Sequence, residues 1–108
     1  MAGECALRLT RRYSAPPAEV WLALTEPDSV ARWLGQPLGT VLREEPPHLL
    51  ELDWSTEGEP ASAVRFELFE ADGGTLLVLD HRGIAAPRGM AAMSFWTRAF
   101  DRFPLEPR

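Results

Sequence analysis

Four consecutive stretches of the chain alternate apolar and polar residues, and a single amphipathic stretch follows them. Alternation with period two predicts strands that are covered on one face. Asp72, Gly73 and Gly74 are a turn signal of the Asp-Gly kind, so the last two strands should pair antiparallel. Because short turns join these strands, they should form a meander with one apolar face to cover. The four predicted strands span residues 39–45, 48–56, 63–71 and 75–82.

The amphipathic stretch near the C-terminus is the predicted cover for this sheet. About sixteen residues before Pro104 repeat with helical spacing, and a helix of that length spans about 24 Å, enough to cross a sheet. Polar residues, including Ser94, Arg98, Asp101 and Arg102, occupy the opposite side and are expected to face solvent. The expected inward face consists of Ala92, Met93, Trp96, Ala99, Phe100 and Phe103.

The N-terminal third predicts one strand and two short helices. Residues 4–13 alternate, with Leu7, Leu9, Arg11 and Tyr13 on one face, and residues 17–24 have helical spacing after a pair of prolines suited to a first turn. A second helix should begin near Pro27, with Thr25 and Asp28 as a capping box, and stop at Gly35. The prediction is an α+β fold: a curved antiparallel sheet of about five strands wrapped on a long C-terminal helix.

Composition limits the functional classes. A chain of 108 residues predicts one domain, residues 1–108, and a net charge of -5 argues against a nucleic-acid partner. Cys5 is the only cysteine, no apolar run approaches a membrane span and no signal peptide is visible, so we expect a cytoplasmic protein. One cysteine and two histidines offer no metal-ligand spacing, and no nucleophile motif is present, so we predict no cofactor, no metal site and no catalytic residues.

Four segments resemble a known family. They are RRYSAPPAEVWLALTEPDSVARWLG, GTVLREEPPHLLELDW, GGTLLVLDHRGI and the aromatic terminal helix, which together cover nearly the whole chain. They are similar to the helix-grip fold of the START and pollen-allergen (SRPBCC) superfamily, and more narrowly to the branch named after the activator of heat-shock protein 90 ATPase. The resemblance implies a domain that holds a small molecule between sheet and helix.

One departure from the family pattern is a missing strand. Family members usually carry another strand after the Trp-Leu-Gly ending, but only Gln36, Pro37 and Leu38 precede the Gly-x-Val strand here. Residues 39–45 should therefore form an exposed sheet edge, and exposed edges favour pairing with another chain. This predicts a homodimer through the edge as one partner arrangement.

The leading functional prediction is non-catalytic binding of a small hydrophobic or amphipathic ligand under the terminal helix. His81 shares a face with Leu77 and Leu79, where a histidine serves as acid, base or ligand anchor, or as hydrogen-bonded scaffolding. Arg11 should be buried and should need either a carboxylate or an anionic ligand. The expected ligand-binding residues are the walls Trp33, Trp54, Phe66, Met93, Trp96 and Phe100 and the polar groups Arg11, Tyr13 and His81.

The sequence leaves two other functional interpretations open. A protein-interaction or self-associating module with a filled core and no ligand would use the exposed edge. The superfamily resemblance also implies an enzyme of the cyclase or dehydratase type as a third option, which would need a roomy polar cavity.

Overall fold

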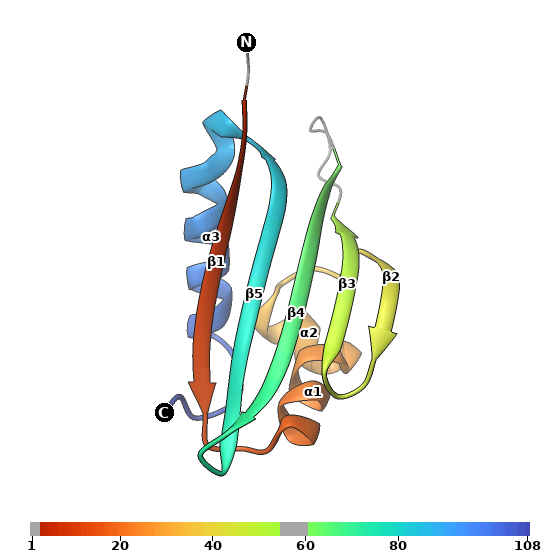
Figure 1. Cartoon of the computed structure of the whole chain (residues 1–108), viewed down its shortest axis with the longest axis vertical. Coiled ribbons are helices and arrows are strands. Elements are labelled where there is room, and N and C mark those ends of the chain that lie inside the picture. Colours follow the sequence, from red (N-terminus) through yellow and green to blue (C-terminus); the bar gives the residue numbers. More distant parts are fainter. Residues whose placement is uncertain (1–2, 55–60) are drawn as a thin grey trace.

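The computed structural model describes residues 3–54 and 61–108 and has the element order of a helix-grip fold (Figure 1). The predicted strand over 48–56 is observed as β3, and its last two residues lie outside the described residues. The elements are β1 (Glu4–Tyr13), α1 (Pro17–Thr25), α2 (Pro27–Trp33), β2 (Thr40–Glu45), β3 (Leu49–Trp54), β4 (Ser62–Ala71), β5 (Gly74–Ala85), the 3-10 turn η1 (Ala86–Arg88) and α3 (Gly89–Asp101).

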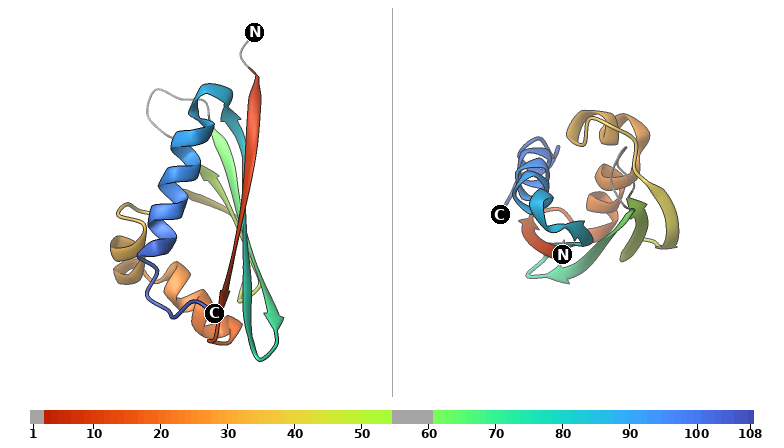
Figure 2. Two further views of the ribbon diagram at one scale, coloured as in Figure 1. Left: turned by 90° about the vertical axis from the view of Figure 1, so that its left-hand side faces the viewer. Right: turned by 90° about the horizontal axis from the view of Figure 1, so that it is seen from above.

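The five strands form one antiparallel sheet in the order β1-β5-β4-β3-β2. The sheet curves, with α3 packed on β1 and β5 and with α1 packed on β4 and β5 (Figure 2). The β4–β5 turn places Asp72 and Gly73 at positive φ, as the Asp-Gly signal requires. The predicted fold class, including the five strands and the two short helices after β1, is confirmed.

Two local expectations were wrong. Glu26 is the residue before α2 and makes no side-chain cap, so there is no capping box; the Thr25 hydroxyl donates instead to the Trp21 carbonyl oxygen at 2.8 Å. Pro17 and Pro27 open their helices in the first turn, where the missing amide hydrogen of proline costs no intrahelical bond, and no described side chain caps either helix. The terminal helix is also shorter than expected, at 13 residues, because Arg88 belongs to η1 and the helix ends at Asp101 with Arg102 as its C-cap.

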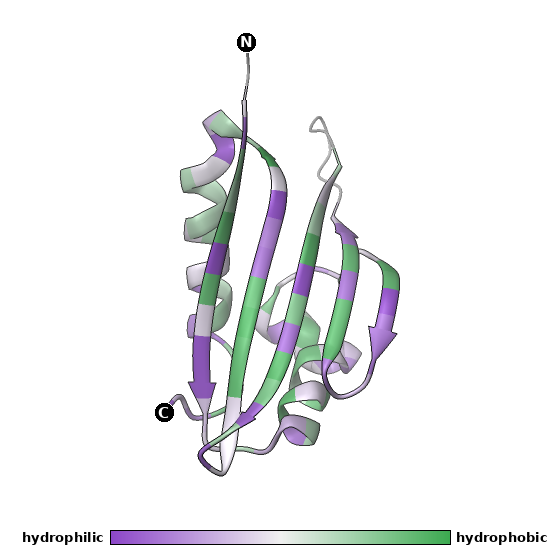
Figure 3. Cartoon of the chain, in the orientation of Figure 1, coloured by the Kyte–Doolittle hydropathy of each residue, from purple (hydrophilic) through white to green (hydrophobic). Residues whose placement is uncertain are grey.

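The outer face of the sheet carries a row of alternating charges that crosses all five strands. In register from β1 to β2 the row reads Arg8, Asp80, Arg65, Glu51, Arg43. Arg8 binds Asp80 through two bonds, Nε to Oδ1 at 2.7 Å and Nη2 to Oδ2 at 3.3 Å, and Nη1 of Arg43 lies 3.8 Å from Oε1 of Glu51. Opposite charges at directly paired positions favour this register, because a slip of one residue would bring the row onto the apolar face. Figure 3 shows the resulting alternation along β4.

The open edge of the sheet is β2. All six of its residues are exposed, including Val41 at 49% and Leu42 at 63%. The register with β3 shifts between Val41 and Arg43, which is the signature of a β-bulge. Bulges blunt an edge against further pairing, so β2 combines exposed apolar residues with a feature that opposes long ladders.

The charge row predicts the effect of reversing one of its members. Glu51→Lys places a cation between Arg43 and Arg65, and like charges at paired positions should lower the free energy of unfolding by about 1 kcal/mol. Urea denaturation at low salt measures the loss, which should shrink in 0.5 M NaCl because the sites are partly exposed. Glu70→Lys, an exposed position of β4 outside the row, is the matched control. If both variants lost the same free energy of unfolding, the paired charges of the row would not stabilise the strand register.

Candidate functional site

An aromatic cluster occupies the space between the sheet and α3. Trp33, Phe66 and Trp96 are each 0% exposed. Trp33 stacks on Phe100 with ring centroids 5.8 Å apart, and the edge of Phe66 meets Trp33 at 6.4 Å and Trp96 at 5.9 Å. Four of the nine expected ligand-binding residues therefore contact one another. Their mutual contacts make them part of the hydrophobic core.

His81 lies at the centre of a hydrogen-bond chain that joins α3 to three strands. The indole N–H of Trp96 donates to Nδ1 of His81 at 3.0 Å. Nε2 of His81 is 2.7 Å from the Ser62 hydroxyl, which donates to the Trp54 carbonyl oxygen at 3.0 Å. Because an indole only donates, Nδ1 must be the unprotonated nitrogen, and neutral His81 carries its proton on Nε2. Both ring nitrogens are thus satisfied by the protein itself.

The environment of His81 opposes protonation. Its side chain is buried, and desolvation lowers the pKa from 6.5 to about 4. A proton on Nδ1 would also eliminate the acceptor for Trp96. At neutral pH His81 is therefore a neutral scaffold residue. This geometry supports the hydrogen-bonded role among the two that the sequence left open.

The two polar residues from β1 are placed differently from each other. Tyr13 is 2% exposed and its ring packs on Phe103 at 5.1 Å; burial raises the pKa of its hydroxyl to about 12. Arg11 is only half-buried, so the expectation of a buried charge was wrong. Its guanidinium carbon lies 5.7 Å from the Phe100 ring centroid and Nη1 donates to the Thr10 carbonyl oxygen at 2.9 Å. The aromatic face thus takes the place of a carboxylate partner.

Trp54 and Met93 lie at the boundary of the cluster. Trp54 ends β3 and contacts Trp96 at 5.0 Å and Phe95 at 6.1 Å. Met93 is 38% exposed, because residues on its side of α3 are only partly covered by the sheet. The structure therefore brings eight of the nine residues to the cluster or its rim and leaves Met93 partly exposed.

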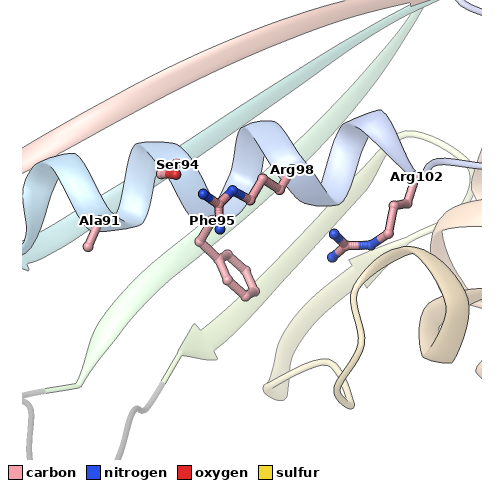
Figure 4. A pocket seen from close by; sticks show the side chains of 5 residues that line it. All are labelled: Ala91, Ser94, Phe95, Arg98 and Arg102. Atoms are coloured by element: carbon pink, nitrogen blue, oxygen red, sulfur yellow. The ribbon is translucent and has the colours of Figure 1, made fainter.

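A groove that the sequence analysis did not assign runs along α3. Its volume is about 430 Å3, and the described residues that line it are Ala91, Ser94, Phe95, Arg98 and Arg102. Figure 4 shows Phe95 and Arg102 projecting away from α3, while the side chain of Arg98 runs along the helix toward Phe95. The sequence contained a signal for it: two arginines four residues apart share one side of a helix. The helical pattern alone predicts only a solvent-facing surface on that side.

The described ranges 3–54 and 61–108 contain no group of three or more histidine, cysteine, aspartate or glutamate side chains arranged to hold a metal ion. No helix within them combines the length and the apolar character needed to cross a membrane. The indole N–H of Trp33 is fully buried and lacks a hydrogen-bond partner among these residues.

The family model described as activator of Hsp90 ATPase homolog 1-like protein matches residues 36–104, which run from the segment before β2 to the end of α3. The chain belongs to this family. The match includes β5 with His81, the whole of α3 and the groove along it. A comparison of this sequence with curated proteins found no match.

Solved structures that share this fold at 25% identity or more include those of two proteins, CalU16 and DynU16. The crystal structure of CalU16 from Micromonospora echinospora is 28% identical with a TM-score of 0.79, and the alignment covers 94% of this chain and 80% of CalU16. DynU16, a protein of the dynemicin biosynthetic locus, is 25% identical with a TM-score of 0.78; the alignment covers 91% of this chain and 45% of DynU16.

A third structure shows the fold alone. An HSP90 activator from Plasmodium falciparum is 18% identical with a TM-score of 0.76, and the alignment covers 94% of this chain and 91% of that protein. The resemblance to the SRPBCC superfamily and its activator branch is therefore confirmed, and the fold is that of a ligand-binding or chaperone-activator-like domain.

His81 predicts a specific pH dependence of stability. Its pKa is about 4 in the folded protein and 6.5 in the unfolded chain, so between these values only the unfolded chain binds the proton. The contribution of His81 to the free energy of unfolding is complete above pH 6.5 and is lost as the pH falls toward 4, by about 3 kcal/mol. Urea denaturation across this range measures it.

Two variants separate this effect from the titration of carboxylates. His81→Gln keeps one acceptor and one donor but does not titrate, so its stability should fall less between pH 6.5 and 4. His48→Gln removes the other histidine and should behave like the unaltered protein. If His81→Gln lost as much stability as the unaltered protein over this range, the neutral-histidine assignment would be wrong.

Proposed function

We propose that this domain is a non-catalytic binding protein for a small amphipathic molecule, held in the groove along α3 beside the rim of the sheet. The observation that supports it best is the groove itself, which joins the apolar Ala91 and Phe95 to the polar Ser94, Arg98 and Arg102. Small-molecule sites have this mixture, and its volume lies within the usual range of about 300–1,000 Å3.

The aromatic cluster supports the groove instead of forming the ligand chamber. Trp96 is fully buried and holds α3 to β5 through His81, and Trp54 packs against Phe95, whose ring forms part of the groove. Of the nine residues expected from the sequence, Trp54 is the one with a described contact to a groove residue from outside α3. In the proposal Trp54 extends the apolar wall, and the other cluster residues fix the position of α3.

The relatives are compatible with this proposal and add no ligand. CalU16 and DynU16 share the fold at 28% and 25% identity, and the HSP90 activator shares it at 18%. The proposal includes a cytoplasmic location, which a single cysteine favours.

We infer self-association through β2 as a second candidate function. The exposed apolar side chains of Val41 and Leu42 on an unpaired edge favour it. An antiparallel pairing of two copies would extend the sheet through β2. The bulge at Leu42 restricts such a ladder to a few residues.

Blocking the groove tests the binding proposal. Ser94→Trp fills the groove from an exposed position of α3, so it should weaken binding of the neutral dye N-phenyl-1-naphthylamine at least tenfold without lowering the melting temperature. Fluorescence titration measures the affinity. Asp101→Trp adds the same side chain to α3 outside the groove lining and should bind like the unaltered protein. Absence of dye binding in the unaltered protein, or equal binding in both variants, would refute the proposal.

Light scattering tests the second candidate. Leu42→Lys should convert a dimer to a monomer at protein concentrations near 100 μM, because a lysine on an edge opposes pairing. Leu22→Lys, at an exposed position of α1, is the control for a change of one apolar residue to lysine. A protein that is monomeric before any substitution excludes pairing through β2.

A further inference from the structure

We propose that the groove along α3 selects a carboxylate-bearing amphipath, such as a medium-chain fatty acid, and that Arg98 and Arg102 together bind its carboxylate. This inference rests on the proposed binding function and specifies the class of ligand. It concerns two residues that the sequence analysis placed on a solvent-facing side.

The charge balance of the chain distinguishes these two arginines from several others. The protein has a net charge of -5, and acidic partners are available to its arginines. Arg8 pairs with Asp80, Arg43 with Glu45 and Glu51, and Arg65 with Glu67. Within residues 3–54 and 61–108, no carboxylate pairs with Arg98 or Arg102, although both line the groove. An acidic protein thus presents two cations on one wall of a groove.

The spacing of the pair suits a single carboxylate. Side chains four residues apart on a helix have Cβ atoms about 5–6 Å apart, so two long guanidinium groups can approach one anion from adjacent turns. Arginine presents its donors in a planar fork that matches carboxylate geometry. Two charge-assisted contacts from one helix would fix the head of the ligand at the C-terminal half of α3.

The opposite end of the groove suits a hydrocarbon chain. Phe95 lies one turn before Arg98, and Ala91 lies one turn before Phe95. The Phe95 ring is half-buried against Trp54 and Trp96, with centroids 6.1 and 5.2 Å away, so it is held in place as an apolar wall. A ligand with a carboxylate at Arg98 and Arg102 would lay its chain along Phe95 toward Ala91.

Two features of α3 oppose an anion and limit the expected affinity. The C-terminal end of a helix carries partial negative charge, and Asp101 lies between the two arginines in sequence. The Arg102 and Phe103 amides bind the carbonyl oxygens of Ala99 and Phe100, which satisfies two of the terminal acceptors. Asp101 is exposed and is not among the residues that line the groove, so solvent screens it.

Competition binding with matched probes tests the inference. Decanoate, decan-1-ol and decylamine share a chain length and differ in the head group, and each is titrated against the bound neutral dye. Decanoate should bind about tenfold more tightly than decan-1-ol, and decylamine should bind most weakly. The preference for decanoate should fall several-fold between 20 and 300 mM NaCl, because the arginines are exposed.

Substitutions test whether Arg98 and Arg102 cause the preference for decanoate over decan-1-ol. Arg98→Gln/Arg102→Gln should lose about tenfold in decanoate affinity and less than twofold in decan-1-ol affinity. The matched control is Arg12→Gln/Arg82→Gln, which changes the net charge equally at two exposed arginines outside the groove and should retain the preference. Circular dichroism melting confirms that both proteins fold.

The outcomes separate this inference from the function on which it rests. If the neutral dye binds but decanoate and decan-1-ol compete equally, the carboxylate inference is overturned and the binding proposal stands. If the control double variant loses the preference to the same extent, the net charge of the protein is responsible and the inference is again overturned. If no probe binds, both proposals fail together.

Discussion

The hydrogen bond from Trp96 to His81 is the contact on which the rest of this structure depends. It joins the middle of α3 to β5, a strand that pairs with both β1 and β4. An indole can only donate, so the bond requires a neutral histidine, and the histidine in turn orders Ser62 and the end of β3. In a fully buried setting an unmade bond of this kind is costly. The chain therefore fixes the position of its terminal helix with a polar contact inside an aromatic core.

This contact also explains why the inner face of α3 is packed with aromatic rings while the groove side carries charged side chains. With α3 held close to the sheet, Trp33, Phe66, Trp96 and Phe100 fill the interior with their own rings. A helix held in this way leaves one side free, and that side carries Phe95, Arg98 and Arg102. In our proposal the ligand lies along the helix that the sheet grips, because the rings of the aromatic cluster fill the space between helix and sheet.

The sequence predicted the fold because its signals were local and agreed with one another. Alternation in β3 and β4, the turn at Asp72 and Gly73, and the prolines that open α1 and α2 are each read from a few neighbouring residues. The site was harder, since it depends on distances between elements. Periodicity placed His81 on the inner face, yet only the structure shows that Trp96 and Ser62 occupy both of its nitrogens. The predicted burial of Arg11 was wrong. Alternation shows which face of a strand a residue occupies, but it does not show how completely the rest of the protein covers that residue.

Charge is the property that the sequence described least completely. The net charge of -5 argues against nucleic-acid partners, but it does not show which individual charges are paired within the protein. Register places Arg8, Asp80, Arg65, Glu51 and Arg43 in one row on the outer face, where each cation has an acidic neighbour. Arg98 and Arg102 lie on α3, away from that row, and line a groove next to an aromatic wall. Asp80 and Glu51 are engaged with arginines of the sheet, so in our proposal an anion from outside the protein complements Arg98 and Arg102.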